Sequence, residues 1–121
     1  MAGCFPPLPT VPLFARVDAF CDTDDNWNLL AEVTHEDGPE AVVAVFVEVG
    51  LAFYDDNDQP YTEGQIGAPV DLFPLEGTED AWGAQVVSDP SFLDCEYPFE
   101  YYFIFVAEDD EGDQAGRRFI N

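Results

Sequence analysis

Apolar and polar side chains alternate along most of this chain with a period of two residues, which is typical of β-strands that bury one face. Between Leu13 and Cys21 the odd-numbered positions are apolar, whereas Arg16 and Asp18 fall on the other side. The alternation begins again at Trp27 and continues to residue 34. Further strands are predicted over 40–49, 51–54, 69–75, 81–87 and 99–108, with a last short strand that ends at 119–120.

Turn-forming residues separate these segments, and helical patterns are nearly absent. The run Asp37-Gly38-Pro39 is a strong turn signal. No apolar stripe of helical period extends beyond one turn, and the 10 prolines are scattered along the chain. About seven to nine short strands separated by turns predict an all-β fold, an antiparallel β-sandwich of two sheets.

The first 12 residues differ from the rest, because four of the 10 prolines lie between residues 5 and 12. Proline-rich segments of this kind are extended and stiff. We therefore expect an N-terminal arm or tether over residues 1–12 and one β-sandwich domain over residues 13–121.

Two segments suggest a family for this domain. Residues 102–115 run from an apolar strand through an Asp-x-x-Gly-Asp turn into the final strand, and Glu32–Gly38 leads into the apolar strand Val43–Val49. In this order they resemble the last two strands and the B and C strands of bacterial immunoglobulin-like domains from secreted and surface proteins. The resemblance implies an immunoglobulin-like sandwich in which the strands over 43–49 and 99–108 are neighbours in one sheet.

The charge of the chain is strongly negative. There are 26 acidic and three basic residues, which gives a formal net charge of −23. Such a surface repels nucleic-acid backbones and anionic membranes, so neither is an expected partner. Because 47% of the residues are hydrophobic, the chain can still bury a core. Adaptation to a salty habitat, binding of cations and simple solubility each explain the excess of acids.

Two acidic turns are candidate calcium sites. The turn over 22–28 places side-chain oxygens at alternate positions, as the first half of an EF-hand loop does, and the segment 108–113 holds five acids around a glycine. The alternative is that both are ordinary solvated turns, because Asp and Asn are common turn residues. The candidate calcium ligands are Asp22, Asp24, Asn26, Asp109, Asp110 and Asp113.

The three cysteines divide into a pair and a single residue. Cys21 and Cys95 border predicted strands and are expected to form a disulfide, the alternative being two buried free thiols. The run Ala2-Gly3-Cys4 resembles the end of a bacterial lipoprotein signal, which implies a lipid on Cys4 as the one route of membrane attachment. A disulfide and a lipid both predict an extracellular or cell-envelope location on a bacterial surface.

Catalytic patterns are weak. The single histidine, His35, lies in an acidic turn where we expect it to be exposed, and the only serines are Ser88 and Ser91. No Gly-x-Ser-x-Gly elbow or zinc-type Cys and His spacing is present. We therefore expect no enzymatic activity.

The two most apolar strands, over 43–49 and 99–108, carry hydrophobic side chains on both faces at their centres. A sandwich buries one face of each sheet, so the other face would expose an apolar patch. The chain's own loops or arm are an alternative cover for this patch. The expected patch, or its opposite face, comprises Val42, Ala44, Phe46, Tyr102, Ile104 and Val106.

This patch predicts a non-catalytic interaction module that binds a protein or glycan partner. The alternative is a structural subunit that assembles with copies of itself into a filament, layer or shell, using residues 5–14 and the apolar patch.

Overall fold

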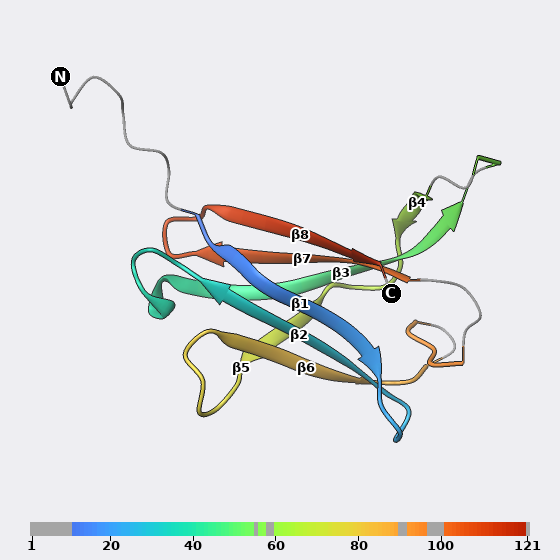
Figure 1. Cartoon of the computed structure of the whole chain (residues 1–121), viewed down its shortest axis with the longest axis horizontal. Coiled ribbons are helices and arrows are strands. Elements are labelled where there is room, and N and C mark those ends of the chain that lie inside the picture. Colours follow the sequence, from blue (N-terminus) through green and yellow to red (C-terminus); the bar gives the residue numbers. More distant parts are fainter. Residues whose placement is uncertain (1–10, 55, 58–59, 90–91, 97–100, 121) are drawn as a thin grey trace.

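The computed structural model describes residues 11–54, 56–57, 60–89, 92–96 and 101–120, so that Cys4 and most of the predicted arm lie outside the described residues. The described residues form β-strands joined by turns (Figure 1). The elements are β1 (Leu13–Cys21), β2 (Asn26–Thr34), the 3-10 turn η1 (Pro39–Ala41), β3 (Val42–Tyr54), β4 (Pro60–Gln65), β5 (Val70–Pro74), β6 (Ala81–Val87), β7 (Tyr101–Asp109) and β8 (Gln114–Ile120). No helix in the described part of the chain is long and apolar enough to cross a membrane.

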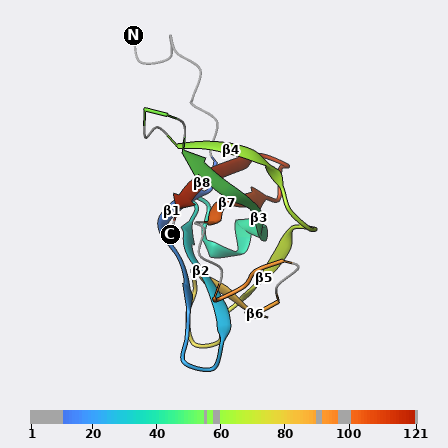
Figure 2. The ribbon, with the colours of Figure 1, turned by 90° about the vertical axis from the view of Figure 1, so that its right-hand side faces the viewer.

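Seven strands form one continuous antiparallel sheet in the order β1-β2-β6-β5-β3-β7-β8, and β4 pairs with β3 outside this path. Viewed from the end, the strands surround a common interior, so the sheet is barrel-like and nearly closed (Figure 2). The predicted all-β antiparallel fold is confirmed. The division into two separate sheets is not confirmed, because β5 pairs with β3 through Val70–Leu72 and with β6 through Phe73–Pro74.

The two ends of the sheet, β1 and β8, meet along a seam. Successive antiparallel pairings leave these two strands running in the same direction. Across the seam, Arg117 Nη1 donates a hydrogen bond to the Phe14 carbonyl oxygen at 3.2 Å. The Phe14 ring also packs edge-on against Phe105, with a centroid separation of 6.4 Å. A side-chain hydrogen bond therefore bridges β1 and β8, and the Phe14 ring ties β1 to β7.

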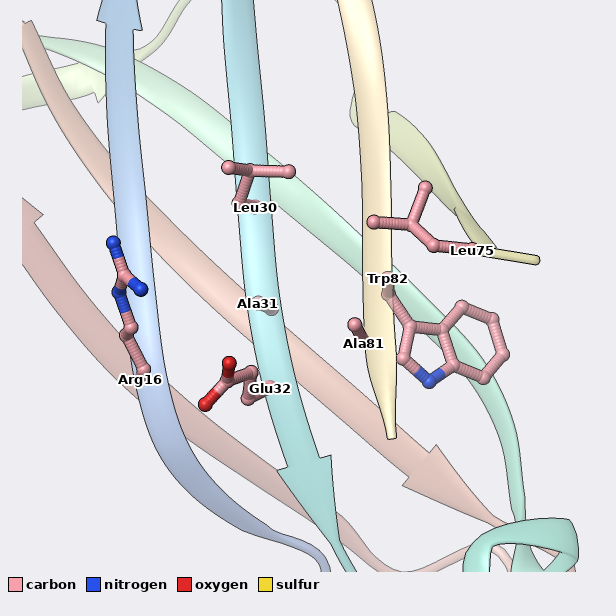
Figure 3. Close-up of a pocket in the computed structure, with 7 residues that line it drawn as sticks. All are labelled: Arg16, Leu30, Ala31, Glu32, Leu75, Ala81 and Trp82. Atoms are coloured by element: carbon pink, nitrogen blue, oxygen red, sulfur yellow. The ribbon is translucent and has the colours of Figure 1, made fainter. Parts of the chain in front are cut away.

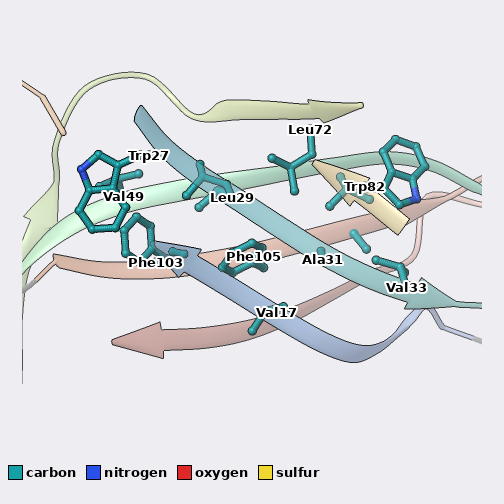
Figure 4. Packing of buried hydrophobic residues seen from close by; sticks show 14 of the residues in the cluster. Val17, Trp27, Leu29, Ala31, Val33, Val49, Leu72, Trp82, Phe103 and Phe105 are labelled. Carbon is teal, nitrogen blue, oxygen red and sulfur yellow. The ribbon is translucent and has the colours of Figure 1, made fainter. Parts of the chain in front are cut away.

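The interior is filled by alternate residues of every long strand, as the period of two predicts (Figure 4). Phe103 and Phe105 of β7 and Leu29 of β2 have no exposed surface. Trp27 packs against Phe103 at a ring-centroid separation of 5.5 Å, which anchors one end of the core. Burial of this apolar area is the main force that holds the sheet together.

Two β-bulges reverse the predicted faces at the start of β1 and of β3. The register shifts between Phe14 and Arg16, so Leu13 is exposed while Phe14 packs on the core. The register of β3 shifts between Val42 and Ala44 against β7. Val42 therefore lies in the core, not on the outer face where we expected it, and Val43 is 54% exposed. A bulge adds one residue to a strand and so reverses the alternation beyond it.

Tyr102 is a second exception to the predicted faces. Its neighbours Tyr101 and Phe103 belong to the core, so alternation would leave Tyr102 on the exposed outer face, but its side chain is buried. Its ring lies directly over Gly50, where even a Cβ atom would overlap it. The guanidinium of Arg118 lies over the same ring, 5.7 Å from its centroid. Tyr102 is thus covered by β3 and β8 and is not a free contact residue.

Candidate functional site

The outer face of β3 and β7 carries three contiguous apolar side chains, Phe46, Ile104 and Val106, which we call the outer stripe. They project outward because the residues beside them in each strand face the core. Phe46 is paired directly with Val106 across the two strands, and Ile104 follows on the same face of β7. All three are half-buried. Of the five residues predicted to contact a partner, these three form one surface, whereas Val42 and Tyr102 do not belong to it.

Charged residues border the outer stripe. Glu48 and Arg118 flank Ile104 on its two neighbouring strands. Asp71 on β5 lies opposite Phe46. Glu108 lies one step beyond Val106, where its Oε2 accepts a hydrogen bond from Gln114 Nε2 at 3.3 Å. The rim of the stripe is therefore mostly acidic, with one arginine at the β8 side.

The first acidic turn uses its carboxylate to hold the backbone. Asp22 Oδ1 accepts hydrogen bonds from the backbone N–H groups of Asp24 at 2.9 Å and Asn26 at 3.0 Å. Asp22 Oδ2 accepts one from Asn28 Nδ2 at 2.9 Å. The bond from Asn28, helped by the backbone donors, lowers the pKa of Asp22. Both oxygens are thus already engaged in closing the turn between β1 and β2.

The second acidic turn contains a buried histidine–carboxylate pair. His35 Nε2 lies 3.1 Å from Asp109 Oδ2, and the two side chains are 2% and 1% exposed. Asp109 Oδ1 accepts hydrogen bonds from the backbone N–H groups of Glu111 and Asp113 at 3.0 and 2.9 Å. The expectation that His35 is exposed is wrong, because its ring is enclosed between the turn after β2 and the turn after β7.

Neither turn gathers carboxylates in the way a cation site requires. The carboxylates of Asp22 and Asp109 are occupied as hydrogen-bond acceptors. Among the described residues there is no group of three or more His, Cys, Asp or Glu side chains that could hold a metal ion. The calcium hypothesis therefore finds no support in this arrangement.

The pKa values of the buried pair move in opposite directions. Its hydrogen bond with Asp109 raises the pKa of His35 above the ordinary 6.5, against the effect of burial, and the nearby carboxylates of Asp37 and Asp110 add to this rise. Burial alone would raise the pKa of Asp109, but the hydrogen bonds from His35 and from the backbone of Asp113 and Glu111 together lower it. The backbone N–H of Asp37 donates a hydrogen bond to His35 Nδ1 at 3.0 Å, so a proton on Nδ1 must displace this bond.

These directions predict how stability depends on pH. A raised histidine pKa gives stability that is present below pH 6.5 and is lost as the pH rises through the folded-state pKa. Because His35 is the only histidine, its ring proton signals in an NMR titration are unambiguous, and we expect a midpoint above 6.5. The loss of stability at rising pH should disappear in H35Q. A midpoint at or below 6.5 would contradict the assigned effect of Asp109.

The predicted disulfide is present between Cys21 and Cys95, with Cα atoms 5.9 Å apart. It joins the end of β1 to the segment before β7. That segment is further held by Ser88, whose Oγ accepts a hydrogen bond from the backbone N–H of Cys95 at 2.9 Å, and by Tyr101, whose hydroxyl accepts one from the N–H of Asp94 at 2.9 Å. These bonds connect Asp94 and Cys95 to Tyr101 at the start of β7 and to Ser88 after β6.

A small hollow of about 150 Å³ lies on the outer face of β2 and β6 (Figure 3). Leu30 and Leu75 both approach Gly83 of β6, where a Cβ would meet their Cδ2 atoms at 3.0 and 3.3 Å. Arg16 and Glu32 lie at its other side, and Arg16 Nη2 is 3.6 Å from Asp18 Oδ2. The hollow is lined by Arg16, Leu30, Ala31, Glu32, Leu75, Ala81 and Trp82, and so it contains no nucleophile or histidine.

Sequence reasoning missed the pairing of His35 with Asp109, which are 74 residues apart. The one available signal was that the strands over 43–49 and 99–108 were expected to be neighbours. In that arrangement the turn before the first strand lies beside the turn after the second strand. That adjacency is confirmed by the pairing of β3 with β7.

Comparison with known proteins yields no relative from which a role could be transferred. No protein-family model, no curated protein and no solved structure significantly matches this chain.

Proposed function

We propose that the protein is a non-catalytic interaction module that binds a protein partner through the outer stripe. The observation that carries this proposal is the contiguous apolar surface of Phe46, Ile104 and Val106 across the two central strands β3 and β7. An apolar centre with a charged rim is the usual composition of a protein contact surface. Its three side chains carry no hydrogen-bonding group, which favours a protein over a glycan.

Charge defines the partner further. The chain has a net charge of −23, and Glu48, Asp71 and Glu108 border the stripe. A partner with a basic rim would be attracted and oriented before contact, whereas a second copy of this chain would be repelled. This charge weighs against the self-assembling subunit, which remains the alternative.

Neither His35 nor Ser88 is poised for nucleophilic catalysis, which supports a binding role. Within the described residues, His35 uses Nε2 for Asp109 and Nδ1 for the backbone of Asp37. Ser88 Oγ lies 3.4 Å from Asp94 Oδ1 and accepts the N–H of Cys95. The histidine is thus unable to activate a nucleophile without first breaking these contacts.

We also propose that the barrel-like sheet is a variant of the immunoglobulin-like sandwich. The strand order supports this, since β1-β2-β6 and β3-β7-β8 would form the two sheets and β5 would join them. The disulfide supports an oxidising compartment, and hence an extracellular or cell-envelope location.

The test of the binding role replaces two stripe residues with polar residues of similar shape, in the variant I104T/V106T. Proteins captured from an extract of the source organism by the immobilised wild type are identified, and their binding to each variant is then measured. We expect I104T/V106T to bind the partner about tenfold or more weakly, as when an interface anchor is lost.

The matched control is L13T/V87T, which replaces two apolar residues that are exposed away from the stripe. It should bind the partner as the wild type does. Thermal unfolding establishes that both variants are folded. Equal binding by the wild type and by folded I104T/V106T would refute the proposed surface.

A further inference from the structure

The place where β5 changes its pairing opens a hollow beside the outer stripe. β5 leaves β3 after Leu72 and pairs with β6 from Phe73 onward, so the start of β3 is not covered by β5. The hollow between β3 and β5 has a volume of about 340 Å³. It is lined by Val43, Ala44, Val45, Asp71, Leu72, Phe73, Pro74 and Trp82.

The hollow combines an exposed aromatic ring with an unpaired carboxylate. Phe73 is 64% exposed, and Asp71 lies two residues before it and therefore on the same face of β5. Within the described part of the chain, the Asp71 carboxylate makes no hydrogen bond or ion pair. Val43, also exposed, and the buried side chains of Trp82 and Leu72 add apolar lining to the hollow.

The hollow is also continuous with the outer stripe, because Asp71 is paired with Phe46. A partner that covers Phe46 would therefore reach Asp71 and Phe73 with its next side chains. A cation over an aromatic ring and beside a carboxylate gains from both, and the aliphatic stem of an arginine or lysine can lie on apolar walls.

We propose that this hollow binds an arginine or lysine side chain of an extended basic segment of the partner protein. The identity of that partner rests on the proposed function. The stem of the basic side chain lies between Val43 and Phe73, and its charged head pairs with Asp71. The net charge of −23 attracts such a segment over the whole surface, and the hollow gives it a defined position.

The probe that tests the hollow is the peptide acetyl-Val-Arg-Val-amide, added to isotope-labelled full-length protein at physiological ionic strength. We expect the NMR signals of Val43, Asp71 and Phe73 to shift most. The same peptide with neutral citrulline in place of arginine should shift them far less. The variants D71N and F73L should each weaken binding roughly threefold, as expected for one exposed ion pair or one cation–π contact.

The matched control is D24N, which removes one exposed carboxylate at a turn outside the hollow. It should leave peptide binding unchanged. Shifts spread evenly over the acidic turns, equal shifts with citrulline, or unchanged binding by both D71N and F73L would each overturn the inference.

The same variants separate this inference from the proposed function. If I104T/V106T loses the captured partner but D71N and F73L bind it at full affinity, the proposed role of the hollow is refuted and the proposed role of the outer stripe is supported. If the peptide binds in an Asp71-dependent way while I104T/V106T still captures the partner, the proposed role of the hollow is supported and the proposed role of the outer stripe is refuted.

Discussion

Removal of the Cys21–Cys95 disulfide is expected to lower the free energy of unfolding by about 4 kcal/mol. The bridge closes a loop of 74 residues and joins the end of β1 to the segment before β7. Without it the unfolded chain explores many more conformations, so the folded state loses relative stability. The variant C21A/C95A avoids leaving a free thiol, and urea unfolding measures the change.

The control for this prediction is chemical reduction. Reducing the wild type should produce a similar loss of stability, whereas reduction should leave C21A/C95A unchanged. The variant C4A, which keeps both bridge cysteines, should unfold at the wild-type urea concentration. Equal stability of the wild type and C21A/C95A would show that the bridge contributes nothing to the fold.

Truncation of Phe103 is expected to cost about 3–5 kcal/mol, the range for a fully buried phenylalanine changed to alanine. Its ring has no exposed surface. It packs against Trp27 at 5.5 Å and against Phe119 at 6.3 Å between centroids, and so it joins β2, β7 and β8. Alanine would leave a cavity that these rings cannot fill without moving the strands.

Chemical unfolding of F103A tests this expectation. Because a loss of this size approaches the total stability of a small domain, F103L serves as a milder variant. The matched control is F73A, at a phenylalanine that is 64% exposed, where we expect a change below about 1 kcal/mol. Equal losses in F103A and F73A would mean that the core is not organised around Phe103.

Strand positions were predictable from the sequence because a strand in this fold shows its buried face as a period of two. β2 follows this rule throughout, with Trp27, Leu29, Ala31 and Val33 buried. The rule fails at Leu13 and Val42, since a bulge depends on how a strand pairs with a distant neighbour. The double role of β5 was likewise beyond local pattern, because it is decided by the pairing of Phe73 with Gly83.

The candidate site was predictable in part for the same reason. We expected one outer face to carry Phe46, Ile104 and Val106. A sheet in a sandwich buries only one of its faces, so two neighbouring strands that are apolar on both faces must leave one face outside the core. Tyr102 fits the same pattern, but Gly50 gives its ring a place to lie, which no local signal reveals. The sequence left the acids of the turns open as cation ligands or ordinary turn residues, and Asp22 and Asp109 accept hydrogen bonds that shape the turns themselves.

Site-specific photo-crosslinking tests directly whether the outer stripe is the contact surface. A photoreactive phenylalanine analogue at Phe46, activated in an extract of the source organism, should form a covalent adduct with a basic partner protein. The same analogue at Phe20, an exposed phenylalanine on β1, should not form that adduct. Identical adducts from both positions, or an adduct at Phe20 alone, would show that the outer stripe is not the contact surface. An adduct at Phe46 made only of two copies of this chain would replace it with self-assembly.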